Sequence, residues 1–171
     1  LETMQKLGSV FTRHGWILRS GNCKGADQAF QSGANRVAPV MVEVFLPWQG
    51  YEQDCLVAGN VVHTPSALAY EMAARYHPAW KKCGPAGRAF HARNVQIVLG
   101  AGLNEPVELI VCWTPGGRVV GGTAMAMRLA AANGIALKNL ALVSSAVLLW
   151  DVLGENEPLS WDCSGQNEFW W

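Results

Sequence analysis

Two glycine-rich turns constrain the fold of this chain more than any other feature. The first, residues 19–27, follows the short apolar run 16–18 and leads into a helical segment. The second, residues 114–123, follows the apolar run 107–113 and also leads into a helical segment. A strand, a turn and a helix in this order make up most of a βαβ unit, which places its strands in a parallel sheet. The chain is therefore predicted to be an α/β protein.

Apolar periodicity, together with the positions of glycine and proline, predicts the other elements. We expect helices at residues 2–14, 25–37, 65–75, 85–98, 124–132 and 144–153, and strands at residues 16–20, 41–46, 107–113 and 135–142. Thr64 is the expected cap of the third helix, residues 48–62 are expected to form a long irregular loop, and the tail at about 155–171 has no regular pattern. Strands that alternate with helices predict a Rossmann-like, doubly wound parallel sheet with helices on both faces, formed by one domain over residues 1–171.

Length and charge agree with this class and disfavour others. A chain of 171 residues suits one domain, and its 13 basic residues balance 13 acidic ones. Strong sequence-independent binding to DNA needs uncompensated Lys or Arg on one face, so the charge balance disfavours it. No signal peptide and no apolar stretch of about 20 residues is visible, so we expect no contact with a membrane.

The cysteines and histidines form no familiar metal motif. The five cysteines are spread along the chain without a Cys-x-x-Cys pair, and the four histidines include no His-x-x-x-His. This distribution fits a reducing compartment and predicts no metal site. We also expect no cofactor.

The first glycine turn has the composition of an anion site. Gly21 and Gly25 permit close approach to the backbone, and the free N–H groups at the start of the following helix attract negative charge. Arg19 and Lys24 add cationic side chains. The alternative is a purely structural turn in which Asp27 stabilises the start of the helix.

The second turn is more specific, because it combines four glycines with a threonine at the start of a helix. Gly116, Gly117, Gly121, Gly122 and Thr123 predict a nest of backbone N–H groups with a hydroxyl donor, suited to a phosphate. The turn is neither a Walker motif nor a Gly-x-Gly-x-x-Gly fingerprint, which disfavours a kinase, an ATPase or an NAD-dependent dehydrogenase. Since ligands of parallel sheets bind at the carboxyl ends of the strands, both turns are expected to face one nucleotide-like ligand.

Three segments together resemble the SLOG superfamily, and within it the small DNA-processing-protein-A-like proteins of phages and bacteria. They are Ser20-Gly21 with Gly25-Ala26-Asp27, His91-Ala92-Arg93-Asn94, and Thr114-Pro115-Gly116-Gly117 with Gly121-Gly122-Thr123. The resemblance covers about residues 1–142 and implies a Rossmann-like fold, nucleotide or nucleic-acid binding through the glycine turns, a homo-oligomer, and the cytoplasm of a bacterium or phage-infected host. The ligand residues that it implies are Arg19, Ser20, Gly21, Lys24, Gly25, Asp27, Arg93, Asn94, Thr114, Gly116, Gly117, Gly121, Gly122 and Thr123.

The chain departs from the enzymes of the superfamily that it resembles, the cytokinin-activating phosphoribohydrolases, at the catalytic carboxylate. Those enzymes carry a glutamate after the second turn, whereas Thr123 is followed here by Ala-Met-Ala-Met. Asp27 and Glu43 are the remaining candidates to stabilise an oxocarbenium-like transition state, and each also has a structural interpretation. The first hypothesis is therefore a sensor, carrier or sequestering protein for a nucleotide derivative. The alternatives are a nucleoside or nucleotide N-glycosidase and a single-stranded DNA-binding accessory protein.

The relatives also have a strand before the first helix, in the centre of the sheet, which this chain does not show. We expect an open slot there, which either further residues of the natural protein or another segment fills; direct pairing of residues 16–20 with 107–113 would refute this. Trp48 is a candidate for stacking on a base, with packing of its loop as the alternative. Arg93 is expected either to meet a phosphate or to form an ordinary ion pair.

Overall fold

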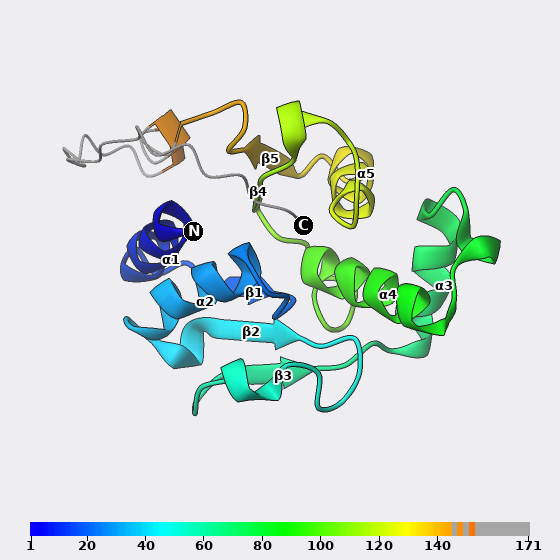
Figure 1. Cartoon of the computed structure of the whole chain (residues 1–171), viewed down its shortest axis with the longest axis horizontal. Helices are drawn as coiled ribbons and strands as arrows, with labels where there is room; N and C mark the ends of the chain where they lie inside the picture. The colour runs from blue at the N-terminus through cyan, green and yellow to red at the C-terminus, as the bar shows by residue number, and fades with distance from the viewer. Residues whose placement is uncertain (145–146, 149–150, 153–171) are drawn as a thin grey trace.

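The computed structural model describes residues 1–144, 147–148 and 151–152 and has an α/β fold (Figure 1). Its α-helices are α1 (Glu2–Arg13), α2 (Ala26–Asn35), α3 (Ala67–Tyr76), α4 (Pro85–Leu99) and α5 (Ala124–Ala132). Its strands are β1 (Leu18–Ser20), β2 (Val42–Phe45), β3 (Val61–His63), β4 (Leu109–Cys112) and β5 (Ala136–Asn139). Short 3₁₀ helices are η1 (Pro39–Met41), η2 (Gln53–Cys55), η3 (Trp80–Lys82) and η4 (Pro115–Gly117). The expected helix at 144–153 lies partly, and the tail at 155–171 entirely, outside the described residues.

The five expected helices that lie wholly in the described residues are confirmed, but two details were wrong. The loop predicted at 48–62 contains η2 and ends in strand β3, which is too short to show a period of its own. Ser66, rather than Thr64, caps α3, because the Ser66 hydroxyl accepts a hydrogen bond from the Ala69 N–H at 3.3 Å. In the described part of the chain, no helix combines the length and the apolar character needed to cross a membrane.

The strands form two small parallel sheets instead of one continuous sheet. One sheet has the order β1-β2-β3 and the other consists of β4 and β5. In the first sheet Leu18 pairs with Val42 and Glu43 with Val61; in the second, Leu109 pairs with Ala136. Figure 1 shows β4 and β5 apart from the three-stranded sheet.

A cavity of ≈ 690 Å³ separates the facing edges of β1 and β4. Its walls come from α1, β1, α2 and β4, and include Leu18, Phe30 and Leu109. No described residue pairs with β4 on the side that faces β1. Leu109 to Val111 of β4 are therefore only half-buried, although residues 107–113 are apolar enough for a strand in the middle of a sheet. The open slot expected from the sequence is therefore present in the described residues, and the direct pairing that would have refuted it is not.

Helices α1 and α2 pack so closely that two glycines are required where they cross. A Cβ atom on Gly33 would lie 1.7 Å from the carbonyl oxygen of Gln5, and one on Gly8 would lie 2.3 Å from that of Phe30. The Ser9 hydroxyl donates to the Gly33 carbonyl at 2.8 Å across the same contact. Helix α2 in turn packs against β1.

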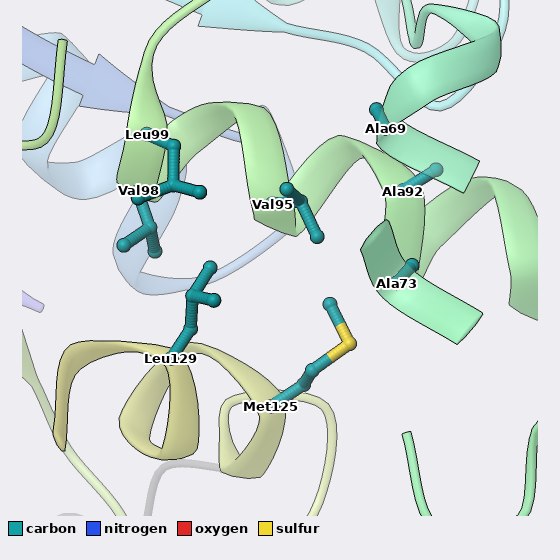
Figure 2. Packing of buried hydrophobic residues seen from close by; sticks show 8 residues of the cluster. All are labelled: Ala69, Ala73, Ala92, Val95, Val98, Leu99, Met125 and Leu129. Carbon is teal, nitrogen blue, oxygen red and sulfur yellow. The ribbon is translucent and has the colours of Figure 1, made fainter. Parts of the chain in front are cut away.

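Helices α3, α4 and α5 enclose the largest apolar cluster. Figure 2 shows Met125 and Leu129 of α5 directed toward Val95 and Val98 of α4. Alanines from α3 and α4 complete the cluster and allow these two helices to approach closely. Because α4 also contacts β1 and β2, it joins this core to the three-stranded sheet.

Candidate functional site

The Arg93 guanidinium of α4 lies inside the first glycine turn. Arg93 is only 4 % exposed, and a Cβ atom on Gly21 would lie 1.1 Å from its Nη1. Nη1 donates to Asp27 Oδ2 at 3.5 Å, and Nη2 donates to the Cys23 sulfur at 3.2 Å. The guanidinium carbon also lies 5.5 Å from the centre of the Phe90 ring, a cation–π distance. Gly21 is therefore glycine because the guanidinium occupies the place of a side chain.

Three buried polar atoms around this turn have no hydrogen-bond partner among the described residues. They are Ser20 Oγ, Asn22 Oδ1 and Arg93 Nε. Asn22 has a positive φ of 62° and is held by its amide, which donates to the Glu52 carbonyl at 2.9 Å. Buried polar groups are normally paired, so three orphans around one turn indicate that a water molecule or a polar ligand belongs there.

Asn139, at the end of β5, fixes the start of the second turn through two hydrogen bonds. Asn139 Nδ2 donates to Thr114 Oγ1 at 2.7 Å, and Asn139 Oδ1 accepts from the Thr114 N–H at 3.2 Å. Thr114 is thus a buried anchor of the turn, and its hydroxyl is already engaged. Gly116 and Gly117 have φ of 60° and 70°, a conformation that favours glycine. The sequence reasoning missed Asn139, although an Asn at the carboxyl end of the neighbouring strand was a usable signal.

Two consecutive residues of α4 connect the two turns. Arg93 contacts the first turn, and the Asn94 amide donates to the Gly122 carbonyl in the second turn at 3.2 Å. The cavity between the sheets reaches both turns as well, because Ser20, Asp27 and Thr123 line it. The two junctions are thus linked through adjacent residues of α4, and residues of both border one cavity.

The starts of the two helices that follow the turns differ in their suitability for an anion. In α2, Asp27 lies in the first turn and accepts a hydrogen bond from the Cys23 N–H at 3.1 Å, so a carboxylate already occupies this helix end. In α5, the first turn has no acidic residue, and the Thr123 side chain makes no capping hydrogen bond. The first N–H groups of a helix lack partners within the helix, and its dipole favours negative charge there. The start of α5 is thus the better place for a phosphate.

Other predicted ligands lie in ion pairs. Arg19 Nε donates to Glu43 Oε2 at 2.8 Å, because the parallel register of β1 and β2 places these residues opposite each other. Lys24 is largely exposed, and its ammonium lies 3.4 Å from a Glu52 carboxylate oxygen. Arg19 and Glu43 therefore hold two strands together, and Lys24 lies at the rim.

Trp48 belongs to an aromatic cluster that fastens its loop to α4. Its ring lies 5.2 Å from the Tyr51 ring and 5.4 Å from the Phe90 ring, both edge to face. Burial and the hydrogen bond to Cys23 raise the pKa of Tyr51 to about 12. The loop is thus packed next to Arg93, and Trp48 is still 43 % exposed on its outer side.

Comparison with family models, with curated proteins and with solved structures finds no match for this chain.

Proposed function

We propose that this protein binds a nucleotide or a nucleotide-derived ligand in the cavity between its two glycine turns, as a sensor, carrier or sequestering protein. The observation that carries the proposal is the pair Arg93 and Asn94, in which adjacent residues of one helix each contact a different turn. The cavity, whose wall includes Asp27 and Thr123, gives such a ligand room beside both turns.

The two turns favour different parts of the ligand. The uncapped start of α5, with the Thr123 hydroxyl and the preceding glycines, is suited to the phosphate. At the first turn, Ser20 and Asp27 line the cavity, and the Ser20 hydroxyl has no partner among the described residues. A hydroxyl and a carboxylate are suited to the hydroxyl groups of a ribose or to the edge of a base.

We also infer that the two sheets are the halves of one Rossmann-like, doubly wound sheet with helices on both faces, as the resemblance to the SLOG superfamily implies. All the strand pairs are parallel, and the cavity runs along the facing edges of β1 and β4. One further strand in this position would join the two sheets and form the floor of the nucleotide site.

Binding is tested by mass spectrometry of small molecules released from gently purified, heat-denatured protein, followed by calorimetric titration. Nucleoside monophosphates are expected to bind at least tenfold more tightly than the matching nucleosides. Thr123→Val should weaken the monophosphate about tenfold, the value of one hydrogen bond of about 1.4 kcal/mol. Thr64→Val is the matched control, because Thr64 is exposed and far from both turns along the chain. Equal affinity for nucleosides and monophosphates would contradict the phosphate assignment.

One observation favours a second candidate, the N-glycosidase. The Asp27 carboxylate lines the same cavity as Thr123, where it could face the sugar of a bound nucleotide. Its ion pair with Arg93 keeps it in place, as a stabiliser of positive charge requires. Release of free base from nucleoside monophosphates, lost in Asp27→Asn, would establish this activity; an unchanged nucleotide after prolonged incubation would exclude it. The DNA-binding alternative gains no such observation, because half-buried Arg19 and buried Arg93 are both engaged in ion pairs.

A further inference from the structure

Three side chains from separate parts of the sequence meet beside the start of α4. His77 follows α3, Cys83 follows η3, and His91 lies on α4. One ligand atom from each residue lies within 4.8 Å of the other two. The Cys83 sulfur lies 3.7 Å from His77 Nδ1, and the His77 and His91 rings are 4.1 Å apart, centre to centre. We propose that His77, Cys83 and His91 bind a transition-metal ion of the zinc class, at a site independent of the nucleotide cavity.

The spacing of these atoms is that of ligands around a tetrahedral metal. With metal–sulfur and metal–nitrogen bonds of about 2.3 and 2.0 Å, a tetrahedral angle places the two ligand atoms about 3.5 Å apart. The observed 3.7 Å between the Cys83 sulfur and His77 Nδ1 fits this value. The His91 ligand atom lies within 4.8 Å of the other two.

The backbone around the cluster holds the ligands in a tight turn. The His77 N–H donates to the Ala73 carbonyl at 2.9 Å, and the Cys83 N–H donates to the Trp80 carbonyl at 3.1 Å. Pro85 then opens α4, which carries His91 back toward His77. A metal at His77 Nδ1 would replace the 3.2 Å contact of this atom with the Ala79 N–H.

The surroundings of His91 suit a metal ligand. Its Nδ1 is buried and has no hydrogen-bond partner in the described part of the chain. A buried ring nitrogen without a partner is unusual, and binding a metal ion at the His91 ring would account for it.

The donor set defines the class of metal. One thiolate and two imidazoles suit Zn²⁺ or Co²⁺, whereas Mg²⁺ and Ca²⁺ require oxygen ligands. Three protein ligands leave a fourth position for water or another small molecule, and all three residues are only half-buried. The expectation of no metal rested on sequence spacing, and a His-x₅-Cys-x₇-His pattern matches no common motif.

Titration of the chelator-treated full chain with Co²⁺ tests the proposal, because a cobalt–thiolate bond absorbs in the near ultraviolet and a tetrahedral site gives intense visible bands. One equivalent of Co²⁺ should bind with both signatures, with release of the Cys83 proton, and Zn²⁺ should displace it. Cys83→Ser should abolish the thiolate band, and His77→Gln or His91→Gln should each weaken binding by at least about a hundredfold, beyond the 10–100-fold typical of residues that only support a ligand.

Cys55→Ser and His14→Gln are the matched controls, since both residues are exposed and outside the cluster. They should leave the titration unchanged, and circular dichroism should show that all variants are folded. A cluster held only by an S–H···N hydrogen bond would bind no Co²⁺ at equimolar concentration, which would overturn the proposal. A thiolate band that persists in Cys83→Ser would also overturn it, because another cysteine would then be the ligand.

Discussion

Gly21→Ala tests whether the buried guanidinium of Arg93 organises the first glycine turn. The new Cβ atom would lie 1.1 Å from Arg93 Nη1 and 2.3 Å from Cζ, so the two cannot coexist. The backbone at Gly21 does not lie in the left-handed region, so alanine introduces no conformational strain of its own. The substitution therefore acts by expelling the guanidinium.

The expected cost follows from the contacts that Arg93 would lose. Separating the partners of a fully buried ion pair costs about 3–5 kcal/mol. The Asp27 side chain is 23 % exposed and 3.5 Å away, so water compensates part of this loss, and we expect about 2–3 kcal/mol. Displaced packing adds about 1 kcal/mol. For a chain of 171 residues, a total of about 3–4 kcal/mol corresponds to a Tm lower by about 6–16 °C.

Urea and thermal unfolding of four proteins provide the assay: the parent chain, Gly21→Ala, Arg93→Ala and the double variant. Gly122→Ala is the matched control, because a Cβ atom there meets nothing within 4 Å. In the Arg93→Ala background, Gly21→Ala should cost less than about 1 kcal/mol, since only the Asp27 Oδ2 atom, 2.8 Å from the new Cβ atom, then has to move, and it is the end of a side chain. If the cost is the same in both backgrounds, or if Gly21→Ala and Gly122→Ala are equivalent, the assignment is wrong.

Three further predictions concern stability. Asn139→Ala should lower the free energy of unfolding in urea by about 2–4 kcal/mol, because it leaves the buried hydroxyl and backbone N–H of Thr114 unpaired. Asn133→Ala, at an exposed position with one hydrogen bond to a carbonyl, should cost less than about 1 kcal/mol. Gly33→Ala should destabilise the protein by more than about 3 kcal/mol, since the new Cβ atom would lie 1.7 Å from a carbonyl oxygen of α1. Gly87→Ala is its control, because the Cβ atom there would meet only one atom, at 3.8 Å; this variant should be neutral or more stable by up to about 1 kcal/mol. The pKa of Tyr51 is about 12 in the folded protein and about 10 in the unfolded chain. Between these pH values the unfolded chain binds fewer protons than the folded protein, so the free energy of unfolding falls as the pH rises. In equilibrium unfolding, Tyr51→Phe should therefore lose less stability between pH 10 and 12 than the parent chain does.

The helices were predictable because each repeats its apolar pattern over several turns and ends at a glycine, a proline or a polar cap. Helix α5 has the predicted bounds, and α4 differs by one residue at its end. Strand β3 was missed because three residues show no period, and Ser66 was missed because two hydroxyl residues flank Pro65 and only the backbone path distinguishes them.

The site was predictable only at the level of its turns. The glycines marked both turns, and the Arg93-Asn94 pair was singled out as a motif. That Arg93 would fill the space beside Gly21 depends on packing across 72 positions of sequence, which no local pattern contains. The pairing of Arg19 with Glu43 depends likewise on the register of β1 and β2. A predicted ligand residue and a candidate catalytic carboxylate therefore form an ion pair with each other.

The separation of the two sheets has a consequence for how the molecule unfolds. No backbone hydrogen bond between described strands crosses from β1-β2-β3 to β4-β5, so the two halves are coupled only through helices and side chains. Amide exchange is therefore expected to divide the chain into two protection classes, with β4, β5 and α5 opening at a lower free energy than the sheet around β2. Insertion of a strand at the β1–β4 edge would merge these two units into one cooperative transition.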